Sequence, residues 1–162
     1  MRFFVAMLEE HLVVRMGRST RDKLVAEIIS DKSKLNELIH LVCDGTKTQR
    51  MKGAWVLSGI HALNRSVLIP YHGSLIAMLN VETVGGVKRE LLRSFEKSKP
   101  NERIAGELIT LAMEWVTDEK QDLAVRYVCY RLLTPLLADY PELSWELKQK
   151  INLYRDKFGR YP

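Results

Sequence analysis

The chain has few of the residues that mark disulfide-stabilised or membrane-spanning proteins. Its 162 residues include only two cysteines, Cys43 and Cys129, which lie far outside CxxC spacing. Two isolated thiols are typical of small buried side chains in a reducing compartment, so we expect a cytoplasmic protein. The apolar run at residues 3–8 is too short for the core of a signal peptide. No 18 successive residues are apolar, and we therefore expect no contact with a membrane.

Recognisable catalytic motifs are also lacking. The sequence contains no HExxH, GxSxG, Walker A or GxGxxG pattern. His40 and Cys43 lie three residues apart on one expected helix, but nothing nearby completes the four ligands of structural zinc. Gly85 and Gly86 begin a helix and could cradle a phosphate, although a plain turn is the better interpretation. The sequence therefore predicts no catalytic residue, no metal and no cofactor.

Apolar residues are distributed along the whole chain. It is 46% hydrophobic and 28% charged, which is typical of one ordinary globular domain over residues 1–162. Alternation of period two is not sustained anywhere and no hairpin turn is recognisable, so the fold class is predicted to be all-α. Residues 3–16 lack a clear period, which leaves a strand open there, but we expect a helix.

Residues that begin and end helices divide the chain into short segments. Thr46 with Gln49 forms a capping box, and Asn101 is placed to cap the helix that follows it. Ser19 and Ser33 are predicted to cap two earlier helices. Pro135 lies inside a long apolar run and should interrupt its helix.

Three of the expected helices begin with an apolar residue followed by a basic one. The pairs are Met51-Lys52, Val87-Lys88 and Val125-Arg126, at intervals of 36 and 38 residues. A second amphipathic helix follows each pair, which is the pattern of an α-solenoid. We predict about four antiparallel helix pairs, roughly at residues 19–45, 46–82, 84–118 and 120–158, after an N-terminal capping helix at 1–18.

The segment from Asp122 through Val125-Arg126 to Leu133 resembles the first helix of a HEAT repeat. The resemblance extends over residues 19–158, and an armadillo-like variant remains the alternative. It implies right-handed stacking of helix pairs, with the second helices along a concave surface. It also implies a scaffold or adaptor that binds another protein or peptide. A minority of the family bind nucleic acid or, like the alkylpurine DNA glycosylases, act as enzymes.

The expected second helices carry the predicted partner-binding residues. Their polar positions include His72, Arg103, Glu107 and Glu114, a mixture of charges that suits a protein partner better than a polyanion. Glu107 and Glu114 could form an acid–base pair, but a solvated face is the better interpretation. Trp145 lies off the apolar stripe of its helix and is predicted to be a contact residue.

The two remaining tryptophans are predicted to lie in the core, and a row of basic residues suggests an alternative function. Trp55 and Trp115 are expected in the core. Arg89, Arg93 and Lys97 form an i, i+4, i+8 row, and the net charge is +5. Nucleic-acid binding through that row and the basic tail at residues 148–162 is the alternative function, disfavoured because the row is expected on the convex side. The predicted function is a non-catalytic protein-binding scaffold, with a DNA glycosylase third.

Overall fold

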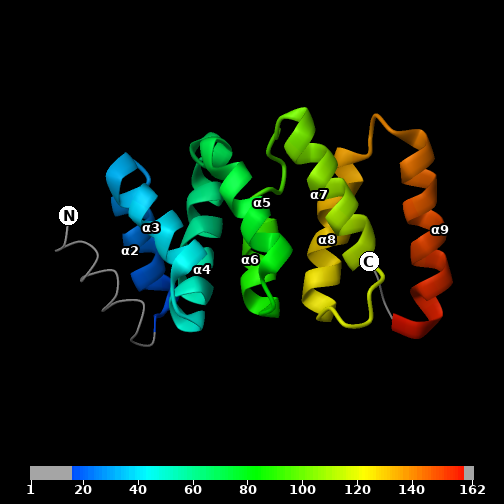
Figure 1. The fold of residues 1–162 in the computed structure, drawn as a ribbon, viewed down its shortest axis with the longest axis horizontal. Coiled ribbons are helices and arrows are strands. Elements are labelled where there is room, and N and C mark those ends of the chain that lie inside the picture. Colours follow the sequence, from blue (N-terminus) through cyan, green and yellow to red (C-terminus); the bar gives the residue numbers. More distant parts are fainter. Residues whose placement is uncertain (1–15, 159–162) are drawn as a thin grey trace.

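The computed structural model describes residues 16–158 as a row of helix pairs (Figure 1). The capping helix predicted at the N-terminus falls almost wholly outside these residues. None of the helices in this part of the chain has both the length and the apolar character to cross a membrane. The elements are α2 (Arg18–Ile28), α3 (Lys32–Asp44), α4 (Lys47–Leu63), the 3-10 helix η1 (Arg65–Tyr71), α5 (His72–Val81), α6 (Gly85–Arg93), α7 (Glu102–Trp115), α8 (Leu123–Leu136) and α9 (Pro141–Phe158).

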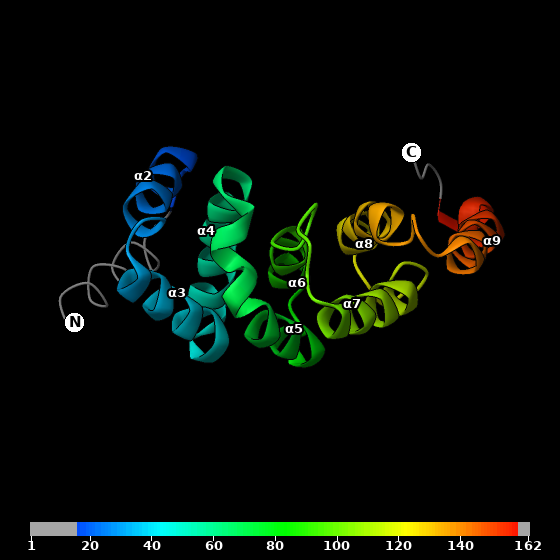
Figure 2. The same cartoon turned by 90° about the horizontal axis from the view of Figure 1, so that it is seen from above.

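The helices form two rows, as the predicted all-α solenoid of antiparallel pairs requires. Helices α2, α4, α6 and α8 pack in succession along one row, while α3, α5 and α7 form the second. Viewed from above, the molecule is an arc with α2, α4, α6 and α8 on its inner side (Figure 2). We call these four helices the inner row, and α3, α5 and α7 the outer row.

The prediction that second helices line the concave side is therefore wrong. The reason is the difference in packing between the rows, since neighbouring inner helices approach each other more closely than outer ones. Gly59 of α4 lies so near α2 that an added Cβ would stand 2.8 Å from a methyl carbon of Val25. Closer approach on one side bends the stack toward that side.

The core lies between the rows. Leu38, Leu57, Leu91 and Leu133 belong to one cluster of fully buried side chains that runs through the helix pairs. This burial of apolar surface is the main stabilising contribution to the fold. Trp115 is buried, as predicted.

Trp55 is only half-buried, which corrects its predicted place in the core. It lies at the surface of the inner row, where the guanidinium carbon of Arg21 stands 5.0 Å from the centre of the indole ring. An apolar stripe on α4 could not reveal this, because α4 packs against α2, α3, α6 and η1 and is apolar on more than one face.

Helix caps confirm part of the sequence interpretation. The Thr46–Gln49 capping box is present, and the Asn101 side chain accepts a hydrogen bond of 3.0 Å from the Ile104 amide. Ser33 is not a cap, because Asp31 begins that helix and its carboxylate accepts from the Ser33 amide at 3.0 Å. Pro135 stands in the last turn of α8, which ends at the next residue.

The N-caps also correct the register of the repeat. The N-caps of the four inner helices are Gly17, Thr46, Val84 and Asp122, and each carbonyl accepts the first backbone bond of its helix from the residue four positions on. That residue is always basic: Arg21, Arg50, Lys88 or Arg126. The equivalent of Lys88 is therefore Arg50 rather than Lys52, and the interval to Lys88 and from there to Arg126 is 38 residues in both cases.

Arg50 links its helix to the loop that leads into the next inner helix. Its Nε donates to Glu82 at 2.9 Å, and its Nη1 donates to the Gly45 carbonyl at 3.0 Å. The Glu82 side chain is only 1% exposed, and its other oxygen accepts from the Thr83 and Val84 amides. Burial alone would raise the pKa of Glu82, but the hydrogen bonds from Val84, Arg50 and Thr83 hold it below its ordinary value.

Lys88 makes the corresponding link one repeat later. Its ammonium nitrogen lies 2.9 Å from the side-chain oxygen of Gln121, which precedes α8, and 4.4 Å from the centre of the Trp115 ring. In α4 and α6, the basic residue at this position thus joins one helix pair to the next.

The space beside the Gly85-Gly86 turn is occupied by another side chain of the protein, that of Asp122. A Cβ added at Gly85 would stand 1.8 Å from Oδ2 of Asp122, so the Asp122 carboxylate lies against the first turn of α6. Free amides and the helix dipole favour a negative charge at that end. The structure places a carboxylate of the next repeat where a phosphate could have bound.

His72 is buried and does not lie on a binding surface, contrary to its prediction. Its ring packs on Phe95 with 4.7 Å between ring centres. Burial, together with nearby His61, lowers the pKa of His72 from 6.5 to about 4. His61 is buried as well, and its Nε2 donates to the Glu96 carbonyl at 2.6 Å.

The link between repeats predicts different effects of two nearby substitutions. Arg50→Ala leaves the buried Glu82 carboxylate without its cation, so we expect the free energy of unfolding to fall by about 2–4 kcal/mol. Lys52→Ala is the matched control and should cost less than about 1 kcal/mol. Urea unfolding of both variants measures the difference. If both variants lost the same free energy of unfolding, the repeat register defined by the N-caps would be wrong.

The buried His72 predicts that the protein loses stability in acid. Between pH 6.5 and about 4 the unfolded chain binds a proton at His72 that the folded chain does not. The free energy of unfolding should therefore decrease as pH falls through this range, by up to about 1.4 kcal/mol per pH unit.

In His72→Phe this contribution is absent, and urea unfolding across the same range should give a flatter dependence on pH. His61, whose pKa is also lowered by burial, retains part of the slope. Met78→Leu, a buried change on the same helix, is the control that should keep the wild-type slope. An unchanged slope in His72→Phe would contradict the assignment.

Candidate functional site

A groove crosses the inner row from α2 to α8. It has a volume of about 610 Å³ and is lined by side chains of α2, α4, α6 and α8 and of the segments that follow α4 and α6. We call it the inner groove. Its charged residues are the basic Arg21, Arg65, Arg93, Lys97 and Arg131 and the acidic Asp22 and Glu96. The groove on the concave side is therefore mainly basic, whereas the sequence predicted a mixture of charges on that side.

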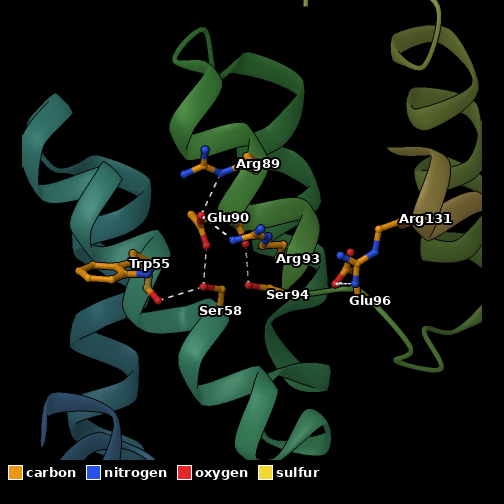
Figure 3. Close-up of polar contacts among 8 residues, drawn as sticks. All are labelled: Trp55, Ser58, Arg89, Glu90, Arg93, Ser94, Glu96 and Arg131. Carbon is orange, nitrogen blue, oxygen red and sulfur yellow. Dashed lines mark hydrogen bonds and ion pairs between the residues drawn. The ribbon is translucent and has the colours of Figure 1, made fainter. Parts of the chain in front are cut away.

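Beside the groove, a buried carboxylate holds two arginines. The Glu90 side chain is 4% exposed and accepts from Arg89 Nε at 3.0 Å and from Arg93 Nη1 at 3.2 Å (Figure 3). Ser58 of α4 reaches the other Glu90 oxygen, with 2.7 Å between the two oxygen atoms. Charge-assisted bonds of this kind fix the orientation of a guanidinium group. Glu90 thus positions two basic side chains on the inner surface.

The far side of the groove repeats this arrangement. Arg131 of α8 donates from Nη2 to Glu96 at 3.2 Å (Figure 3). Lys97, the next residue, has a φ of 58°, a left-handed conformation that is uncommon for a residue with a side chain. Neither Lys97 nor Arg65 makes an ion pair with any residue between 16 and 155, so their charges are not neutralised within this part of the chain.

Two aromatic rings stand beside groove arginines. Arg21 lies over Trp55, and the guanidinium carbon of Arg131 lies 5.8 Å from the centre of the Tyr127 ring. Such cation–π contacts hold a guanidinium plane in place without using its hydrogen-bond donors. Arg21 also donates from Nε and Nη2 to Asp22, so the indole contact and this ion pair together fix it beside the groove.

The structure divides the residues predicted from the sequence into two groups. Arg89, Arg93 and Lys97 lie on or just after α6 in the inner row, not on the convex side as predicted. Arg103 and Glu107 form an ion pair with each other on α7, and Glu114 is exposed on the same outer helix.

Trp145 is 65% exposed on α9, so its predicted exposure is confirmed. Its role in contacting a partner stays a prediction, as do those of Arg103, Glu107 and Glu114. None of these four lines the inner groove.

Around the groove, the sequence did not identify Arg21, Arg65, Arg131 and Ser58 in its lining or Glu90 beside it. Arg21 follows the N-cap Gly17 by four residues, but the sequence predicted that cap at Ser19, from which the same count gives Lys23. The partners Ser58 and Glu90 lie 32 residues apart, and Arg131 and Glu96 lie 35 apart, about one repeat in each case. Such pairs become visible only once the repeat register is known.

The candidate metal ligands and thiols do not come together. Over residues 16–158 no three histidine, cysteine or acidic side chains are arranged to hold a metal ion. His40 instead lies with its Nδ1 2.7 Å from Asp44. Burial raises the pKa of the Cys129 thiol to about 12, which keeps it protonated and unreactive at neutral pH.

Comparison with known proteins agrees with this architecture. The profile of the HEAT repeat domain family matches residues 8–159, nearly the whole chain. Searches of curated proteins and of solved structures find no match. HEAT repeat domains are in general protein-interaction scaffolds. The chain belongs to the HEAT repeat domain family.

Proposed function

We propose that this chain is a non-catalytic scaffold that binds another protein through the inner groove. The observation that carries the proposal is the set of oriented arginines along the concave side of a HEAT repeat arc. Concave surfaces in solenoids are extended and serve as binding faces. A groove of about 610 Å³ is large enough to take several side chains of a partner.

The charges of the two rows support the inner side over the outer. On α7 the exposed Arg103 is paired with Glu107, so the two charges offset each other. In the inner groove, five basic residues stand against two acidic ones. The excess charge supplies both attraction and selectivity for a partner.

The titratable groups near the groove support binding rather than catalysis. Glu90 is buried, and both of its oxygens are engaged by Arg89, Arg93 and Ser58, which leaves it no part in proton transfer. His61 is buried and its Nε2 is used by a backbone carbonyl. The two free thiols, one of them deeply buried, are consistent with a reducing compartment, and we place the protein in the cytoplasm.

Nucleic-acid binding is the second candidate function, and the basic groove is the observation that favours it. Arg93, Lys97 and Arg131 could neutralise phosphates. Against it stands the cover on Trp55: Arg21 lies over one face of its ring, which leaves less aromatic surface on which bases could stack.

A site-specific photo-crosslinker tests where the partner binds. We would place it at Ala62, an exposed position in the inner groove, and at Ala77, an exposed position on outer helix α5, as the matched control. In native lysate we expect Ala62 to give a discrete protein adduct, which Arg93→Ala combined with Arg131→Ala abolishes.

The Ala77 position should not give this adduct, since α5 belongs to the outer row. Adducts from Ala77 alone would contradict the proposed binding face. An Ala62 adduct that nuclease treatment removes would support nucleic-acid binding in place of the scaffold.

A further inference from the structure

We propose that the inner groove recognises a short segment of the partner that is rich in aspartate and glutamate. This inference rests on the proposed function and specifies the chemistry of the partner. It comes from the way Arg93 and Arg131 are held.

Each of these arginines is fixed by one nitrogen and keeps its other donors for a ligand. Arg93 uses Nη1 toward Glu90, and Arg131 uses Nη2 toward Glu96, with 3.2 Å in both cases. Both side chains remain 43% exposed. A guanidinium group has five N–H donors in a planar fork that matches a carboxylate. Two such forks, fixed in advance, lose little entropy when they bind carboxylates of a partner.

Arg65 and Lys97 add positive charge to the same groove. With no ion pair to any residue between 16 and 155, they give the groove a net attraction for an anionic segment. Exposed charges of this kind raise the rate of association with an oppositely charged partner. The paired arginines then provide the specific contacts.

One acidic residue of the groove favours a peptide over a nucleic acid. Asp22 is exposed, and although its Oδ1 accepts from Arg21, its other oxygen can accept from a backbone amide of a peptide, whereas a phosphodiester backbone has no donor to offer it. Single-stranded nucleic acids also require open aromatic faces for stacking. Here one face of Trp55 is covered by Arg21, and Tyr127 lies beside Arg131.

Fluorescence anisotropy with purified full-length chain tests the inference. The probes are a labelled peptide of alternating Glu and Gly, the same peptide with Gln in place of Glu, and single-stranded and duplex DNA of equal charge. We expect binding to the Glu peptide and none to the Gln peptide. Tighter binding to either DNA, or no binding to the Glu peptide, would overturn the inference.

Conservative substitutions separate fork recognition from simple charge. Arg93→Lys and Arg131→Lys keep the positive charge but lose the fork, so each should weaken binding of the Glu peptide about fivefold to tenfold. Arg103→Lys on the outer row is the control and should bind like the wild type. Unchanged affinity in both inner variants would overturn the inference, and thermal unfolding confirms that each variant is folded.

The two proposals fail differently. If the Ala62 photo-adduct forms but the Glu peptide does not bind, the groove binds a protein through other chemistry and only the acidic-segment inference falls. If neither is seen, the proposed function falls with it.

Discussion

The buried ion pair between Arg50 and Glu82 is the constraint on which the inner row depends. Glu82 can be buried only because Arg50 and two backbone amides satisfy it. That requirement fixes the loop before α6 against the first turn of α4, and Lys88 with Gln121 does the same for α8. With these loops held, the inner helices approach closely, the stack curves toward them, and the arginines of α6 and α8 meet across one groove.

Some of the basic side chains of the inner groove are held in place by acidic residues. Glu90 and Glu96 lower the net charge but hold Arg93 and Arg131 in place. A surface of unpaired lysines would attract any polyanion, because its affinity would depend on charge alone. Arginines tied to carboxylates bind more selectively, since the ligand must fit the donors that remain. The geometry therefore favours recognition over general attraction.

The sequence predicted the helices and the family because both depend on local signals. Capping residues such as Thr46 and Asn101, and the apolar stripe of each helix, lie within a few residues of one another. The direction of curvature was predicted wrongly, because it depends on how closely the two rows pack. The groove was missed for a related reason, since Ser58 and Glu90, or Arg131 and Glu96, meet only across a repeat boundary.

The position four residues after each N-cap shows how one sequence feature acquires different roles. Arg50 and Lys88 point toward the loop before the next inner helix, and their hydrogen bonds to Glu82 and Gln121 hold the repeats together. Arg21 occupies the same position in the first described pair, but it lies over Trp55 and lines the inner groove. Whether such a residue stabilises the stack or faces a partner is thus decided by what the following repeat presents to it. The N-caps therefore identify the residues that can join the repeats of this protein, and the contacts between repeats decide which of them face the proposed binding groove.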